Sequence, residues 1–274
     1  MVRLEDDRDR GPGHDGRTMT KSGASHRLLS LLIVFSLLLI WELSARFGWV
    51  SAIFFPAPSL VINTLFEMTA SGVLMQALAA SLFRLAAGIL FGTAIGSVLG
   101  FAMGAYRPIR VVLDPFVAAL HPIPKLAIFP LFLITLGLGE SSRIAVIVSA
   151  SLFPMLLSVM NGVLQINRFY FEIAASYGAS KKMMLLRVIL PGSLPSFFSG
   201  LRLALNTSLV LVIAVEMLSA DDGLGALVWM AWQTMRINET FAVLIVIAVL
   251  GLIFNNVVYI MCRRLIPWQT ADQR

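Results

Sequence analysis

Charged residues are scarce in this sequence, and their scarcity excludes a soluble fold. Only 13% of the 274 residues are Asp, Glu, Lys or Arg, whereas 58% are hydrophobic and the mean hydropathy is +0.86. A soluble domain carries about 25% charged residues. With so few charges, this chain could not cover the surface of a soluble fold. The composition therefore predicts an all-α protein that spans a membrane as one helical bundle and is surrounded by lipid.

Residues and motifs that carry chemistry are also lacking. The single cysteine, Cys262, excludes an internal disulfide and a cysteine-rich metal site. The three histidines, His14, His26 and His121, are scattered along the chain. The sequence contains no phosphate-binding Gly-x-x-x-x-Gly-Lys loop, no His-Glu-x-x-His and no Gly-x-Ser-x-Gly. We therefore expect no catalytic residue, no metal and no cofactor on this chain. A transporter without a nucleotide site must be driven by an ion gradient or by another chain.

Apolar stretches of about 20 residues, the length that crosses a bilayer, locate the spans. They predict about six transmembrane helices, at residues 28–47, 82–105, 115–136, 143–164, 198–219 and 241–262. A seventh uncharged stretch, Gly48 to Phe66, contains Pro56 and Pro58. Two prolines so close together break a helix. We interpret this stretch as an interfacial segment that leads into a short amphipathic helix.

The basic residues predict the orientation. Sixteen of them flank the spans on one side and three on the other, which places both termini in the cytoplasm. This distribution explains the net charge of +6, so no nucleic-acid partner is expected. We expect residues 1–27 to form a disordered cytoplasmic tail, residues 28–268 the transmembrane domain, and residues 269–274 a second cytoplasmic tail.

Small and polar residues within the spans are candidates for packing or transport. Five glycines recur at every fourth position, a spacing that lets two helix backbones approach closely in lipid. They are Gly88, Gly92, Gly96, Gly100 and Gly104. A pore-lining or dimer-contact role is the alternative. Arg84, Asn206 and Glu216 are candidates for the translocation pathway, because polar groups in lipid must face protein or water. For the two charged residues, a structural ion pair is the other possibility.

The loop at about residues 165–196 carries the strongest local signal. Gly178 can adopt the left-handed conformation that ends a helix, and Ser180 can cap the next helix. We expect Pro191 to end that second helix and Pro195 to lie in the first turn of the following span. The pattern predicts a short helical hairpin projecting into the cytoplasm. An ordinary amphipathic connector is an equally good interpretation on physical grounds alone.

The same loop resembles the Glu-Ala-Ala-x-x-x-Gly-x9-Ile-x-Leu-Pro loop of ABC importer permeases. The residues that match are Glu172, Ala174, Gly178, Leu190 and Pro191, while Ile173 and Val188 are mild departures. In that family the loop docks as a coupling helix into a groove on the ATPase subunit. The resemblance therefore implies an ATPase-coupling site, to which Ala175, Ala179 and Ser180 also belong.

Further motifs resemble the nitrate, sulfonate and taurine branch of these permeases, over roughly residues 28–268. They are Phe55-Pro56-Ala57-Pro58, Leu113-Asp114-Pro115, His121-Pro122-Ile123-Pro124-Lys125, Gly137-Leu138-Gly139-Glu140, Gly200-Leu201-Arg202, Val215-Glu216-Met217, Gly223-Leu224-Gly225 and Pro267-Trp268. The resemblance implies a type I ABC importer permease in the bacterial inner membrane. It also implies a permease homodimer, two cytoplasmic ATPase subunits that bind the ATP, and a periplasmic or lipid-anchored binding protein.

The resemblance leaves the solute open. An organosulfonate, taurine or a nitrate-like anion fits the branch, and a thiamine-pyrimidine-like precursor is the alternative within it. Two other classes of protein also remain possible. A gradient-driven secondary transporter would be expected to show buried acid or histidine relays and internal repeats, and a non-transporting membrane scaffold differs only by lacking the loop motif.

Overall fold

The computed structural model describes residues 22–51, 54–219 and 221–266, and all regular elements in these ranges are helices. The chain divides into two compact units, residues 1–60 and 61–274. Of the expected cytoplasmic tails at residues 1–27 and 269–274, residues 1–21 and 269–274 lie outside the described residues, as does the motif Pro267-Trp268. Residues 22–27, expected to be disordered, belong to a helix. The first helix, α1 (Ser22–Arg46), begins earlier than the expected position 28.

The first unit contains α1 and the beginning of α2 (Pro58–Ala70). Glu42 accepts hydrogen bonds from the Ser59 backbone N–H at 3.0 Å and from its hydroxyl at 2.8 Å. Arg46, one turn further along α1, forms an ion pair with the same carboxylate at 2.5 Å. The first N–H groups of a helix lack hydrogen-bond acceptors within that helix. Glu42 provides an acceptor for the Ser59 N–H at the start of α2. The segment between Gly48 and Pro58 is not helical, as the two prolines predict, apart from residues 52–53, which lie outside the described residues.

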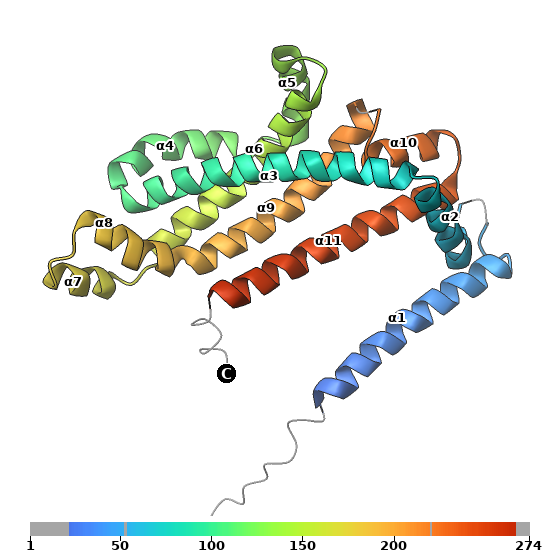
Figure 1. Ribbon diagram of the computed structural model, residues 1–274, viewed down its shortest axis with the longest axis horizontal. Helices are drawn as coiled ribbons and strands as arrows, with labels where there is room; N and C mark the ends of the chain where they lie inside the picture. The colour runs from blue at the N-terminus through green and yellow to red at the C-terminus, as the bar shows by residue number, and fades with distance from the viewer. Residues whose placement is uncertain (1–21, 52–53, 220, 267–274) are drawn as a thin grey trace, which may run out of the picture. The chain divides into compact units, whose positions relative to one another are not determined.

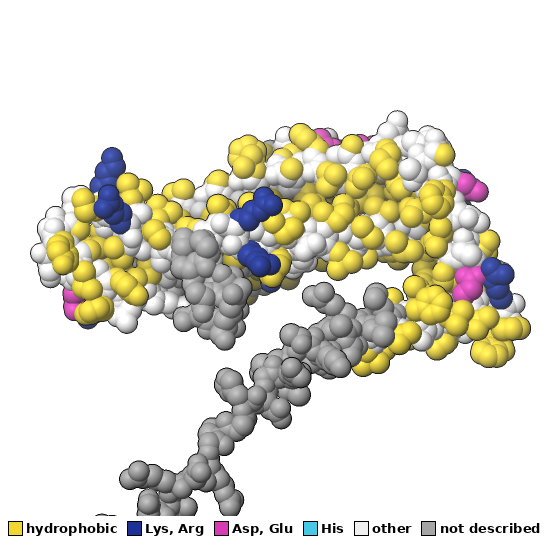
Figure 2. Space-filling model, turned by 60° about the horizontal axis from the view of Figure 1, so that its bottom comes forward, with side chains coloured by type: hydrophobic (Ala, Val, Ile, Leu, Met, Phe, Trp, Pro, Cys, Tyr) yellow, Lys and Arg dark blue, Asp and Glu magenta, His cyan; other side chains and the backbone are white. Residues whose placement is uncertain are grey.

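The second unit is a bundle in which α6 (Glu140–Leu164) packs between α3 (Val73–Ala105) and α9 (Leu190–Ser219) (Figure 1). Two further helices, α10 (Leu224–Gln233) and α11 (Ile237–Leu265), pack on α9. Hydrophobic side chains cover much of the bundle surface in Figure 2, and few charged ones interrupt them. Such a surface suits lipid, because membrane helices present apolar side chains outward.

Four helices of the described residues are long and apolar enough to cross a membrane. They are α3, α6, the continuous helix Lys181–Ser219, and α11. A fifth span results if α4 (Arg107–Leu120) is taken together with the segment Lys125–Leu136. That segment consists of the 3-10 turn η1 (Lys125–Ile128) and α5 (Phe129–Leu136). The expected span at 28–47 lies in α1.

The expected span at 115–136 is not one straight helix, because α4 and the segment Lys125–Leu136 meet at an angle of 88°. Pro122 and Pro124 explain the break. Proline lacks the N–H that continues a helix and pushes the residue before it away from helical geometry. The backbone between residues 121 and 124 is accordingly non-helical.

The prediction that Pro191 ends a helix is wrong, and so is the placement of Pro195 in a first turn. The chain stays helical from Lys181 to Ser219 and both prolines lie inside this helix. It passes through α8 (Lys181–Met184) and a π-helical turn, η2 (Leu185–Ile189), before α9. The Leu190 N–H donates to Leu185 O, five residues back. A π turn is wider than an α turn, and the added width accommodates the ring of Pro191.

The glycines of α3 face α6 with little space between the backbones. A Cβ on Gly96 would lie 2.5 Å from Leu152 O, and one on Gly100 would lie 2.6 Å from Leu156 O. A Cβ on Gly104 would lie 2.6 Å from Val163 Cβ. Gly88 and Gly92 approach Ile147 and Ser151 in the same way. Side-chain atoms cannot fit at these positions, so the row holds the two helices at backbone contact.

Candidate functional site

The predicted hairpin forms from α7 (Arg168–Ser176), α8 and the turn between them. Gly178 has a φ of +70°, and the Ala179 N–H donates to Ala174 O at 3.0 Å. The Gly178 N–H donates to Ala175 O at 2.9 Å. These two bonds make a Schellman motif, which ends a helix by satisfying its last carbonyls. Ala174, Ala175, Gly178 and Ala179 therefore form the turn through their backbone groups.

Caps fix the start of both hairpin helices. The Asn167 side chain accepts a hydrogen bond from the Phe169 N–H at 3.0 Å, and the Ser180 hydroxyl accepts one from the Met183 N–H at 3.3 Å. Leu190 and Pro191 lie beyond η2, at the start of α9, and both are partly buried. The second arm of the hairpin is thus continuous with a 39-residue helix of the bundle.

Large apolar side chains of the hairpin are exposed. Tyr177 is 88% exposed, and Phe169 and Tyr170 are each about 60% exposed. Glu172 is exposed on the same helix. Exposed apolar patches of this kind mark interaction surfaces. The hairpin therefore presents a surface on which a partner protein could dock.

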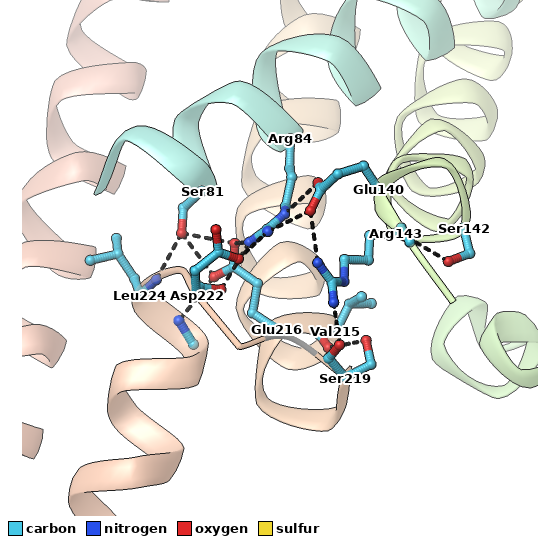
Figure 3. Close-up of polar contacts among 12 residues, drawn as sticks. Ser81, Arg84, Glu140, Ser142, Arg143, Val215, Glu216, Ser219, Asp222 and Leu224 are labelled. Atoms are coloured by element: carbon cyan, nitrogen blue, oxygen red, sulfur yellow. Dashed lines mark hydrogen bonds and ion pairs between the residues drawn. The ribbon is translucent and has the colours of Figure 1, made fainter. Parts of the chain in front are cut away.

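A buried ion-pair network lies at the end of α9 away from the hairpin (Figure 3). Arg84 of α3 is 1% exposed and forms ion pairs with Glu140 at 2.7 Å, with Glu216 at 2.8 Å, and with Asp222. Arg143 forms an ion pair with Glu140 at 2.7 Å and donates to a backbone carbonyl at the end of α9. The network ties α3, α6, α9 and the loop before α10 together.

Glu216 is fully buried, with 0% exposure. Besides Arg84, its carboxylate accepts hydrogen bonds from the Ser81 hydroxyl at 2.8 Å and from the Gly225 N–H at 2.9 Å. The Leu224 N–H donates in turn to the Ser81 hydroxyl at 2.8 Å. A Cβ on Gly223, whose φ is +108°, would overlap this carboxylate. The glycines of the Gly-Leu-Gly motif therefore allow the loop to close over Glu216.

The three pathway candidates lie in two places. Arg84 and Glu216 belong to the ion-pair network, where their charges are matched by protein groups. Asn206 exchanges hydrogen bonds with Asn255 of α11, the shorter at 3.0 Å, and lines a pocket of about 530 Å³ between η1, α6 and α9. Whether any of the three contacts solute stays a prediction.

Sequence reasoning missed the partners of Arg84. Glu140 and Asp222 lie 56 and 138 residues from it along the chain, so no local pattern could pair them. It also missed the pocket and Lys125, which lines it. A lysine among prolines within a span was the available signal. In the described part of the chain, no cluster of His, Cys, Asp or Glu could hold a metal.

Comparison with solved structures identifies the fold. An inward-facing structure of the MetNI methionine ABC transporter aligns with a TM-score of 0.62 at 19% identity, over 72% of this chain and 98% of that one. An amino acid ABC transporter with histidines aligns with a TM-score of 0.58 at 15% identity, over 73% of this chain and 97% of that one. The fold is therefore that of the type I ABC importer permeases.

Comparison of sequences identifies the family. TauC of Escherichia coli (strain K12), a taurine transport system permease protein, is 33% identical over 250 residues, which cover 89% of this chain and 91% of TauC. SsuC of the same strain, named for aliphatic sulfonates transport, is 34% identical and covers 85% of this chain and 88% of SsuC. Residues 88–270 match the family described as the binding-protein-dependent transport system inner membrane component. The chain belongs to this family of membrane-spanning transport subunits, which are not enzymes.

Proposed function

We propose that this chain is the permease subunit of an ATP-driven ABC importer and forms the translocation pathway for a small solute. The observation that supports this most directly is the α7–α8 hairpin. It exposes apolar side chains, ends α7 with a Schellman turn at Gly178, and continues without a break into the 39-residue helix Lys181–Ser219. A push on such a hairpin would be carried along a stiff element into the bundle.

In this proposal the ATP binds to a pair of cytoplasmic ATPase subunits and not to this chain. The hairpin docks on an ATPase subunit through Glu172, Ala174, Ala175, Gly178, Ala179 and Ser180, with Leu190 and Pro191 at its base. A second copy of the chain completes the pathway. Closure of the ATPase pair draws the two hairpins together and opens the cavity to the outside, where a binding protein delivers solute. Rigid-body motion about an interface is the ordinary form of such switching.

We further propose that the solute is a small organosulfonate, taurine or a nitrate-like anion. The names of TauC and SsuC, each of which aligns with more than four fifths of this chain, support this class. The excess of basic residues at the hairpin end and at both termini supports cytoplasmic termini in a bacterial inner membrane.

The test of coupling is the substitution Gly178→Val. Valine resists a φ of +70°, which costs about 1–2 kcal/mol, and its side chain would stand on the docking surface. A Cβ at Gly178 would meet nothing within 4 Å, so the bundle should still fold and insert. We expect solute uptake to fall sharply, with the ATPase lost from the purified complex or hydrolysing ATP without transport.

The matched control is Gly72→Val. Gly72 has a φ of +79° with equally open surroundings, but it precedes α3 at the opposite end of the bundle from the hairpin. Its substitution imposes the same backbone strain, and we expect normal uptake and a stable complex. Both variants are compared at matched membrane abundance. Normal transport by Gly178→Val with its ATPase attached would show that the hairpin is only a connector.

A further inference from the structure

The break between α4 and η1 leaves backbone carbonyls without helical partners. In a continuing helix, Leu120 O would accept from the N–H of residue 124, but that residue is Pro124 and has none. The Lys125 ammonium takes this place, donating to Leu120 O at 2.8 Å and to His121 O at 3.1 Å. The Lys125 side chain therefore caps the C-terminal carbonyls of α4 from beyond the break.

The same ammonium lines the pocket of about 530 Å³ between η1, α6 and α9. It lies 4.3 Å from the centre of the Phe153 ring, a distance at which the ring face attracts a cation. The His121 ring also lies near Phe153, with the two ring centres 5.7 Å apart and the ring planes tilted. Asn206 and Thr207 of α9 also line the pocket. Non-helical backbone at membrane depth occurs where it lines such a cavity.

In the part of the chain that the structure describes, no ion pair neutralises the Lys125 ammonium beside the pocket. Within residues 22–51, 54–219 and 221–266, the ion pairs involve Arg46, Arg84, Arg143 and Arg236, and none involves Lys125. An ammonium has three N–H donors, and two are used on backbone carbonyls. One donor and a full positive charge remain beside a largely apolar pocket. An unpaired charge in a membrane protein is energetically costly unless a ligand or water interacts with it.

We propose that this pocket is an anion-binding site and that the Lys125 ammonium donates its remaining N–H to the anionic group of a small sulfonate. Phe153 and Val210 enclose the apolar part of the solute, and the free side-chain N–H of Asn206 offers a second donor. The site's place on a transport pathway rests on the proposed function, but its preference for anions does not. The two can therefore be tested separately.

The experiment measures the charge preference of the pocket directly. Thr207→Cys is made in a Cys262→Ser background, in the complete complex in membranes. The rates of modification by anionic sulfonatoethyl and cationic trimethylammonioethyl methanethiosulfonate are each divided by the rate for neutral methyl methanethiosulfonate. This division corrects for differences between variants in how accessible the cysteine is.

We expect the anionic reagent to react faster than the cationic one. Lys125→Met or Lys125→Gln should lower the ratio of the anionic to the cationic rate about tenfold, as removal of a unit charge several Å away predicts. Lys125→Arg should keep the ratio.

A control and a competition complete the test. At Leu218→Cys, further along α9 and 65% exposed, the ratio should not respond to Lys125. Methanesulfonate should slow modification of Thr207→Cys by the neutral reagent in the parent and in Lys125→Arg, whereas its uncharged isostere dimethyl sulfone should not. The proposal is overturned if the ratio is unchanged in Lys125→Met, if methanesulfonate gives no protection, or if Thr207→Cys reacts with none of the reagents. None of these outcomes bears on whether the hairpin couples to an ATPase.

Discussion

Removal of Arg84 offers the sharpest test of what the buried network contributes. Arg84→Met keeps an unbranched side chain in place of the aliphatic part of arginine but deletes the guanidinium that joins Glu140, Glu216 and Asp222. Glu140 retains Arg143, and Asp222 is 62% exposed and can be solvated. Glu216 is different, because it is fully buried and Arg84 is its only cation among the described residues.

The expected magnitude follows from these exposures. Breaking a pair so that one charge stays buried costs about 3–5 kcal/mol, whereas losing partly exposed pairs costs about 0–1 kcal/mol each. The loss at Glu216 therefore dominates. A chain of this size loses about 2–4 °C of melting temperature per kcal/mol, so Arg84→Met should melt about 6–20 °C below the parent. The double variant Arg84→Met/Glu216→Gln removes the orphaned charge and should recover about half of the loss or more.

The assay heats detergent-purified protein for a fixed time and measures the fraction that remains monodisperse on size exclusion. Arg236→Met is the control, because the ion pair of Arg236 with Glu239 involves an arginine side chain that is 64% exposed. That variant should shift the midpoint by no more than about 4 °C, the upper value for a surface pair. The reasoning about Glu216 is wrong if Arg84→Met has the same melting midpoint as Arg236→Met. It is also wrong if the double variant is less stable than Arg84→Met alone.

Two further predictions concern packing and orientation. Gly96→Ala would place a Cβ 2.5 Å from Leu152 O and should lower stability by about 1–3 kcal/mol. The control is Gly251→Ala, where the added Cβ has its nearest neighbour at 3.5 Å, and it should be neutral or stabilising in the same melting assay. Alkaline phosphatase fused after Trp268 should be inactive and fused near Asp222 active, and the opposite pattern of activities would overturn the six-span layout.

Local chemistry explains which parts of the structure the sequence could predict. The left-handed turn at Gly178 and the cap at Ser180 depend on neighbouring residues, and both form. The glycine row of α3 carries its own periodicity, although the identity of α6 as its partner does not appear in any local pattern. These features are visible because a few consecutive residues determine them.

The errors arose where the backbone had more than one way to accommodate a residue. Pro191 breaks an α-helix in principle, but the π turn at Leu185–Ile189 absorbs it and the helix continues. The prolines at 122 and 124 instead produce an 88° bend, because Lys125 satisfies the carbonyls that they leave. Identical residues thus had opposite outcomes. Whether the helix continues or bends at its prolines depends on neighbouring side chains and on the width of the local turn. Hydropathy contains no information on either.

The packing of the bundle constrains how a displacement of the hairpin can travel. Near the hairpin, a Cβ on Gly162 would lie 2.5 Å from Ser196 Cβ, and one on Gly200 would lie 2.6 Å from Ser158 Cβ. At these two glycines, α6 and α9 are therefore packed closely as well. At the far end, Arg84 joins the same three helices.

Helices held at backbone contact along their length cannot slide past one another without steric overlap. A force applied at α7–α8 should then turn α3, α6 and α9 as one body. The bent segment of α4, η1 and α5 lacks such glycine contacts in the part of the chain described here, so they do not lock it to the three helices. Lys125 lies at that bend. The pocket that it lines is therefore placed where a change in the bundle's orientation would alter the shape of the site.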